Sequence, residues 1–203
     1  MISEQRIENL QQLNHLVNNC SDCLISTKRK QAVFGGGDPF SPLLIVGEGP
    51  GKDEDESGRP FDGKSGQMLD EALIEAGIHR SKVFVINTVK CRACDWIDGK
   101  SKNRTPSKQE LRNCKKWLDQ QIEILSPRVI LCVGGTSAQA ILGQEVKVTA
   151  IRGILFNVSA EMQAVATLHP AYIMRGTKSE THSKYKQLVN DIYLAWNEAK
   201  KSA

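Results

Sequence analysis

The cysteines are the residues of this sequence whose spacing most directly indicates chemistry. The chain contains six, and five of them lie where metal ligands could: Cys20 and Cys23, Cys91 and Cys94, and Cys114. Two CxxC pairs suit tetrahedral zinc, and four thiolates also suit an iron–sulfur cluster whose ligands come from distant parts of the chain. Spacing alone leaves both open, although the gap between the pairs is far longer than in a compact zinc ribbon.

A carboxylate between glycines, Glu48, is a second candidate for chemistry. It follows an apolar run, Leu43–Val46, that predicts a buried strand, and it lies in the turn Gly47–Gly51. The next loop carries a lone aromatic residue, Phe61, and a stretch of helical periodicity follows it. A strand, a polar loop and a helix place Glu48 and Phe61 at the carboxyl end of a sheet, where open α/β folds bind ligands.

Two nucleotide-binding patterns occur in this segment, and neither has the context that its mechanism needs. In Gly47-x-Gly49-x-Gly51 the third glycine comes one residue too early for a dinucleotide-binding turn. The segment Gly58–Ser65 satisfies the P-loop pattern, but no strand runs directly into it, because the polar stretch 52–57 intervenes. We interpret both matches as chance.

The remaining chain alternates apolar runs with amphipathic stretches, which predicts an α/β fold. Strands are expected at residues 43–46, 82–89, 128–133 and 164–168, with helices at 2–18, 68–76, from about 105 onward, at 137–142 and at the carboxyl end. The expected architecture is three-layer αβα with a central, mostly parallel four-stranded sheet, in a single domain spanning residues 1–203. The polar stretch 95–104 is expected to be a loop, and 151–158 a short β excursion.

Composition fits a globular protein that could bind nucleic acid. The 203 residues carry a net charge of +4, which permits a nucleic-acid partner without requiring one. The first residues have no apolar core of a signal peptide, and no apolar run reaches membrane-spanning length. We therefore expect a cytoplasmic monomer with no membrane association. The basic segments Lys28–Lys30 and Arg175–Lys178 are expected to touch phosphates.

Four motifs occur in an order and spacing that resemble a known family. They are Gly47-Glu48-Gly49-Pro50-Gly51, Gly58-Arg59-Pro60-Phe61, Asn87 on its strand, and His169-Pro170-Ala171-Tyr172. Together with the cysteines they resemble the family 4 uracil-DNA glycosylases, the iron–sulfur branch of that superfamily, from Cys20 to the terminal helix. The resemblance implies hydrolysis of the N-glycosidic bond of uracil in single- or double-stranded DNA, which initiates base-excision repair.

The resemblance also implies roles for the motif residues. Glu48 would be the catalytic carboxylate at the sugar, Glu54 a second acidic residue of that loop, and Phe61 the ring that stacks on the base. Asn87 would recognise the uracil edge, because its amide can donate and accept together. His169 would face the uracil O2 and stabilise the charge of the leaving base.

Further assignments concern DNA contacts and the cofactor. By the resemblance, Ile173 would be the wedge that fills the gap left by the flipped nucleotide, in a loop followed by Arg175 at the DNA backbone. A [4Fe–4S] cluster would be held by four cysteines: Cys20, Cys23, Cys91 and Cys114.

This sequence departs from the family pattern at two places. Gly49 stands where the family usually has alanine, which we expect to be tolerated. The interval from Cys91 to Cys114 is several residues longer than in the family and includes Cys94, which could replace Cys91 as a ligand. The insertion Asp95–Lys102 could contact DNA or be neutral.

Alternatives from other functional classes remain open. One is a catalytically weak or silent member that binds uracil-containing or modified DNA, or one that excises a different base. Others are a zinc-ribbon nucleic-acid module and a P-loop NTPase. Visible absorption separates an iron–sulfur cluster from zinc, and a nucleotide-binding assay tests the NTPase.

Overall fold

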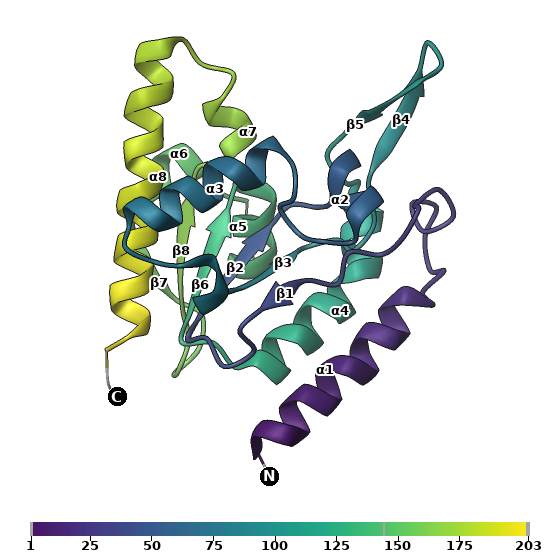
Figure 1. Ribbon diagram of the computed structural model, residues 1–203, viewed down its shortest axis with the longest axis horizontal. Helices are drawn as coiled ribbons and strands as arrows, with labels where there is room; N and C mark the ends of the chain where they lie inside the picture. Colours follow the sequence, from purple (N-terminus) through teal and green to yellow (C-terminus); the bar gives the residue numbers. More distant parts are fainter. Residues whose placement is uncertain (1, 144, 202–203) are drawn as a thin grey trace.

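A six-stranded sheet forms the middle layer of the computed structural model, which describes residues 2–143 and 145–201 (Figure 1). The strand order is β1-β3-β2-β6-β8-β7. The four inner strands are parallel: β3 (Phe84–Asn87), β2 (Leu43–Gly47), β6 (Val129–Val133) and β8 (Gln163–Thr167). These are the four predicted strands. They are almost entirely apolar because helices cover both faces of the sheet.

Two short edge strands extend the sheet beyond the four that were predicted. Strand β1 (Gly36–Gly37) pairs antiparallel with β3, and β7 (Leu155–Asn157) pairs antiparallel with β8. The first was not among the expected strands, because two glycines offer no side-chain pattern. The second lies within the short β excursion that was expected at 151–158.

Helices on both faces complete the three predicted layers (Figure 1). One face is covered by α1 (Ile2–Asn18), α4 (Lys108–Leu125) and α5 (Gly135–Leu142), and the other by α3 (Lys64–Glu75), α7 (Pro170–Ile173) and α8 (Lys178–Ala199). Alternate residues of β2 supply the two cores: Leu44 and Val46 join the first, and Leu43 and Ile45 the second.

The start of α4 lies close to the expected position, whereas α2 (Lys52–Ser57) was not expected to be a helix. Helix α4 begins after Ser107, which caps it and forms a capping box with Glu110, so the helix starts slightly later than the position near 105 that was expected. The stretch expected to be a polar loop, Lys52–Ser57, is instead a short helix, α2, with Gly51 as its N-cap. Shorter elements are η1 (Arg80–Lys82) and α6 (Val148–Ile151).

The polar insertion after the second CxxC pair is a β-hairpin, so its prediction as a loop is wrong. Strand β4 (Cys94–Ile97) pairs antiparallel with β5 (Lys100–Asn103) in a separate two-stranded sheet. Asp98 and Gly99 join the strands with φ of 51° and 70°. Positive φ at both central residues is typical of a type I′ turn, which suits the twist of a hairpin. Among the described residues, no helix is both long and apolar enough to cross a membrane.

Candidate active site and cysteine-lined pocket

Glu48 is the first residue after β2, and two threonines from other segments hold it. Thr88 Oγ1 and the Val89 N–H both donate to the Glu48 carbonyl oxygen, the latter at 3.3 Å. Thr136, at the start of α5, donates its hydroxyl to Glu48 Oε2. The carboxylate therefore has a fixed orientation. Sequence reasoning missed Thr136, because nothing in the chain pattern links it to a residue 88 positions away.

Gly47 lets two predicted site residues approach each other. Gly47 and Asn87 are register partners at the ends of β2 and β3. A Cβ at Gly47 would lie 2.4 Å from Asn87 Oδ1 and 2.6 Å from Phe61 Cε2. The amide and the ring therefore lie over the bare Gly47 backbone, and only glycine leaves them room.

Phe61 occupies a backbone conformation that is uncommon for a residue with a side chain. Its φ is 54°, which costs on the order of 1–3 kcal/mol and persists only where the surroundings enforce it. They do so here: Arg80 Nη2 donates to the Pro60 carbonyl at 2.9 Å, and a Cβ at Gly66 would meet the Phe61 carbonyl oxygen at 1.7 Å. The loop and α3 thus hold the ring in place.

His169 caps α7 and is held as a neutral imidazole. Its Nδ1 accepts a hydrogen bond from the Ala171 N–H at 3.1 Å. Burial, with a smaller contribution from the charge of Arg175, lowers the pKa of His169 to about 4. Because Nδ1 is the acceptor, the single ring proton is on Nε2, which can donate to a ligand. The His169 and Phe61 rings stack with centroids 6.2 Å apart and an interplanar angle of 28°.

These residues form one group, which we call the strand-end site: Glu48, Phe61, Asn87 and His169. Gly134, directly before α5, packs against His169 on one side of this site, where an added Cβ would lie 3.2 Å from His169 Cβ. All four were predicted from the sequence, and Gly47 and Gly134 are positions where a Cβ would crowd three of them. Gly49 also lies in a tight place, where an alanine Cβ would meet Val89 Cγ2 at 2.7 Å. Glycine therefore suits this chain at that position.

Glu54 holds loops together in this structure. Its two carboxylate oxygens accept from the Gly51 N–H at 2.9 Å and from the Gly63 N–H at 3.3 Å. These bonds connect the loop that carries Glu48 to the loop that carries Phe61. The position predicted for a second acidic site residue thus has a positioning role.

Ile173, for which the resemblance implies the wedge role, is buried in this structure. Ile173 is 0% exposed and packs in the core between α3 and α8, because α7 turns its side chain inward. Its neighbours Tyr172 and Met174 are exposed instead. Arg175 lies on the surface beyond α7, close enough for its charge to act on His169.

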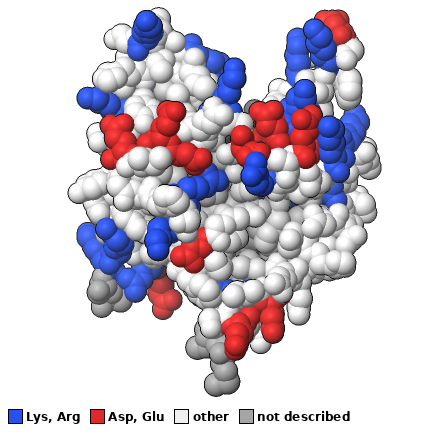
Figure 2. Space-filling view, in the orientation of Figure 1, with Lys and Arg blue, Asp and Glu red and all other residues white. Residues whose placement is uncertain are grey.

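Charge is unevenly distributed over the face drawn in Figure 2. Asp and Glu side chains form a band across the upper part of the view, over α3 and α2, while Lys and Arg side chains lie on the two raised ends and also at the lower left. A polyanion approaching this face would meet its favourable contacts at the raised ends. Of the predicted basic segment Lys28–Lys30, Lys30 pairs with Glu56 at 3.1 Å and Arg29 turns inward.

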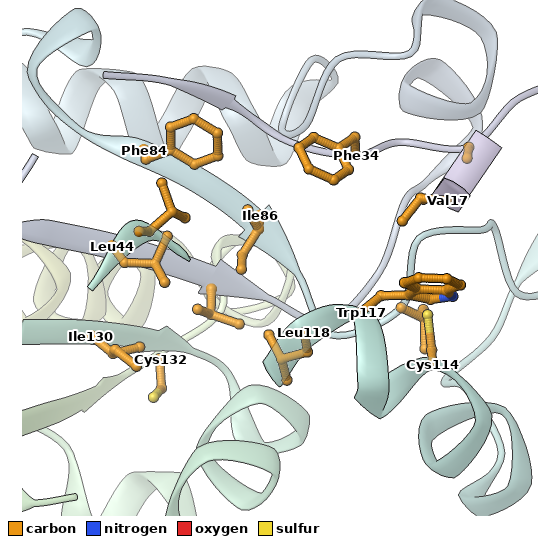
Figure 3. Packing of buried hydrophobic residues seen from close by; sticks show 14 of the residues in the cluster. Val17, Phe34, Leu44, Phe84, Ile86, Cys114, Trp117, Leu118, Ile130 and Cys132 are labelled. Atoms are coloured by element: carbon orange, nitrogen blue, oxygen red, sulfur yellow. The ribbon is translucent and has the colours of Figure 1, made fainter. Parts of the chain in front are cut away.

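Four cysteines line one pocket between α1, α4 and the segment after β3, the cysteine pocket: Cys20, Cys23, Cys91 and Cys114. Cys94 and Cys132 do not line it. Cys94 begins the hairpin, and Cys132 is fully buried in β6. The pocket lining thus distinguishes Cys91, which lines it, from Cys94, which does not, whereas the sequence spacing left both as candidates. Figure 3 shows Cys114 and Trp117 side by side on α4 beneath Val17 of α1.

The sulfurs of the cysteine pocket receive several N–H donors. Arg29 Nη1 donates to Cys91 Sγ at 2.9 Å, the Lys90 N–H to Cys114 Sγ at 3.3 Å, and Trp117 Nε1 to Cys20 Sγ at 3.4 Å. Such donors stabilise thiolates and tune iron–sulfur centres. Without a metal, burial raises the pKa of the Cys91 thiol to about 11, so that thiol is neutral.

The donor set of the cysteine pocket fits a metal group that is bound by thiolates. Four cysteine sulfurs surround one pocket, and three of them receive N–H donors. Among the residues that the structure describes, no three His, Cys, Asp or Glu side chains are grouped in a way that would hold a single metal ion.

Comparisons with known proteins agree with this geometry. A Type-4 uracil-DNA glycosylase from Pyrobaculum aerophilum is 41% identical over 175 residues, covering 82% of this chain and 85% of the relative. A Type-4 uracil-DNA glycosylase from Thermotoga maritima is 36% identical over 176 residues, covering 86% and 88%. The model of the uracil DNA glycosylase superfamily matches residues 34–193. This chain belongs to the uracil DNA glycosylase superfamily.

Proposed function

We propose that this protein hydrolyses the N-glycosidic bond of uracil in DNA and so initiates base-excision repair. The observation that carries the proposal is the strand-end site, in which a carboxylate, an amide, an aromatic ring and a neutral imidazole meet at one edge of the sheet. The relatives named Type-4 uracil-DNA glycosylase support the same reaction.

Recognition rests on Phe61 and Asn87. A glycosylase must take its base out of the stack and hold it in a pocket. The Phe61 ring supplies a face for the flipped base. The Asn87 amide donates to O4 of uracil and accepts from its N3–H, an arrangement that cytosine cannot match. Lys90 Nζ donates to the Asn87 carbonyl oxygen at 2.6 Å and helps to fix the strand end that carries the amide.

Bond cleavage rests on His169 and Glu48. As the bond breaks, negative charge develops on the uracil ring, and His169 Nε2–H stabilises it by donating to O2. The sugar becomes cationic at the same time. The Glu48 carboxylate, held by Thr136, stabilises that charge and orients the attacking water.

The proposal includes a [4Fe–4S] cluster held by Cys20, Cys23, Cys91 and Cys114. When bound, it would supply a structural crosslink rather than a reactive group, because its pocket lies between α1 and α4, on the face of the sheet opposite to α3 and α7. We further propose that the protein acts on DNA as a monomer in the cytoplasm.

The test is base release from a uracil-containing oligonucleotide in single turnover, with thymine, hypoxanthine and cytosine oligonucleotides as comparisons. We expect release of uracil, and a rate about 10²–10⁴-fold lower for Glu48→Gln. The matched control is Asp53→Asn, an exposed carboxylate in the same part of the chain. Binding of uracil DNA without release of any base would contradict the proposal and favour a silent DNA-binding member.

A further inference from the structure

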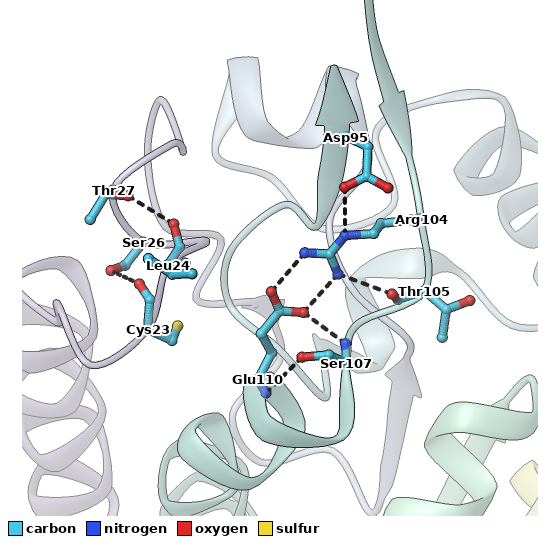
Figure 4. A network of polar contacts seen from close by, with 9 residues as sticks. All are labelled: Cys23, Leu24, Ser26, Thr27, Asp95, Arg104, Thr105, Ser107 and Glu110. Atoms are coloured by element: carbon cyan, nitrogen blue, oxygen red, sulfur yellow. Dashed lines mark hydrogen bonds and ion pairs between the residues drawn. The ribbon is translucent and has the colours of Figure 1, made fainter. Parts of the chain in front are cut away.

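The β4–β5 hairpin is a fixed arm beside the strand-end site. It projects from the body next to α2 (Figure 1). Arg104 holds its first strand to α4, donating to Asp95 Oδ1 at 3.1 Å and to both oxygens of Glu110 at 2.7 and 2.8 Å (Figure 4). Arg92 holds its second strand through Asn103 Oδ1 at 2.6 Å. The charge of Asp95 is thereby matched, and the base of the arm is anchored on both strands.

One face of the hairpin is directed toward the loop that carries Glu48. Asn103 pairs with Cys94, and a Cβ at Gly51 would lie 3.2 Å from Asn103 Nδ2, so this face meets that loop. Side chains two residues apart on a strand share a face. Trp96 and its partner Ser101 therefore lie on the same face, one step farther out. Trp96 is 67% exposed, so the ring stands free on that side.

The opposite face of the arm carries cations. Lys100 and Lys102 pair with Ile97 and Asp95, and both lysines are exposed. In Figure 2 this arm is one of the two raised ends where basic side chains gather beside the acidic band. An exposed aromatic ring on an arm with lysines matches the chemistry of a nucleic-acid strand, whose bases stack on rings and whose phosphates attract cations.

We propose that the β4–β5 hairpin is a second DNA-binding element, in which Trp96 stacks on an unpaired base beside the flipped nucleotide and Lys100 and Lys102 contact phosphates. The proposal rests on the proposed function, because the DNA must lie across the strand-end site to reach the arm. It assigns a role to a ring that the buried core does not use. It also supplies an exposed apolar contact to DNA, which Ile173 cannot provide from inside the core.

The first experiment measures the dissociation constant of the full-length protein for a single-stranded oligonucleotide that carries a non-hydrolysable uracil nucleotide. Fluorescence anisotropy reports binding without bond cleavage. We expect Trp96→Ala to weaken binding by about 5- to 150-fold, as loss of one ring–base stack does. Trp96→Phe should recover most of the affinity, because a smaller ring still stacks.

The matched control is Tyr193→Ala, which removes an exposed aromatic ring, 58% exposed, from α8. We expect it to bind like the wild type. If Trp96→Ala binds as tightly as Tyr193→Ala, the stacking role is wrong. If Trp96→Phe is as weak as Trp96→Ala, the ring does not act by stacking.

The second experiment measures the salt dependence of the same dissociation constant. Replacing both lysines, Lys100→Ala with Lys102→Ala, should reduce the slope of log affinity against log salt by about 1.4, because each phosphate contact on a single strand contributes about 0.7. An unchanged slope contradicts the phosphate role. Loss of DNA affinity in Trp96→Ala, with no uracil release by the wild type, would sustain the hairpin proposal and overturn the proposed function. Unchanged DNA affinity in Trp96→Ala, with uracil release by the wild type, would overturn the hairpin proposal and sustain the proposed function.

Discussion

The strand-end site and the cysteine pocket are built in different ways. Three residues of the first follow parallel strands: Glu48 after β2, Asn87 at the end of β3 and His169 after β8. The sheet brings these ends to one edge, so the site is assembled as soon as the fold is. The cysteines come from a loop after α1, a segment after β3 and the middle of α4, and no sheet positions them.

The two regions also differ in what their buried groups need. The low pKa of His169 keeps its imidazole neutral and ready to donate near neutral pH. Burial also raises the pKa of Cys91 and Cys114, so those thiols are protonated until a metal displaces the protons. Substitutions in the strand-end site should therefore lower the rate of base release, whereas substitutions in the cysteine pocket should lower cofactor content and stability.

The largest expected effect is loss of the cluster. Cys114→Ser should lose nearly all bound iron and the visible absorbance of the purified protein, because one ligand of the pocket is gone. Cys94→Ser is the matched control and should retain both. Iron analysis and absorption spectra make the measurement. Colourless wild-type protein with one bound zinc, or iron lost from Cys94→Ser, would contradict the ligand set.

A second prediction concerns pH and His169. The unfolded chain takes up a proton at His169 as pH falls through about 6.5, whereas the folded protein does so only near 4. The stability that this histidine contributes is complete above pH 6.5 and is lost as pH falls toward 4, by at most about 3 kcal/mol.

Urea unfolding at pH 7 and pH 5 of the wild type and of His169→Asn measures this contribution. The free energy of unfolding should fall by about 2 kcal/mol more in the wild type than in His169→Asn. Equal changes in the two proteins would mean that His169 titrates normally and is not held neutral in the strand-end site.

A third prediction concerns specificity. Asn87→Asp replaces the amide donor with an acceptor, which should favour cytosine relative to uracil by about 5- to 150-fold, the equivalent of about 1–3 kcal/mol for one mismatched buried group. His169→Ala should slow release of uracil without altering that preference, because it acts on the charge of the leaving base. Single-turnover release from matched uracil and cytosine oligonucleotides is the measurement. A wild-type preference in Asn87→Asp would remove Asn87 from base recognition.

The smallest expected effect tests how the carboxylate is held. Thr136→Val removes the hydroxyl that donates to Glu48 and keeps the side-chain shape. Loss of one such hydrogen bond costs about 0.5–1.5 kcal/mol, so release of uracil should slow by up to about tenfold while the fold is retained. Thr149→Val, on α6, is the matched control. Equal rates for the two variants would show that Glu48 needs no support from α5.

The four parallel strands and the strand-end site were predictable from the sequence for a physical reason. Each strand is an apolar run that ends in a polar or glycine-rich turn, so Glu48, Asn87 and His169 had to lie at the carboxyl edge. The family resemblance, rather than the pattern, supplied their roles and the cysteine set. Thr136 was missed because its partner is set by tertiary structure.

The hairpin and the burial of Ile173 show the limits of such prediction. Strand β4 and strand β5 are polar and lie outside the main sheet, so they lack the alternation that marks a half-buried strand. The Asp98-Gly99 pair was a usable signal, because Asp-Gly is typical of a tight hairpin turn. Ile173 was assigned from a motif, and no pattern in four residues tells which side of so short a helix faces the core.

The parts of the cysteine pocket are synthesised at different times. Cys20 and its hydrogen-bond donor Trp117 are 97 residues apart in the chain. At a synthesis rate of about 5–20 residues per second, α1 is made about 5–20 s before the helix that it packs against. During that interval Leu10, Leu13 and Val17 have no α4 to cover them. Helix α1 is thus made well before the helix that covers its apolar face, and it packs only after that helix has been made.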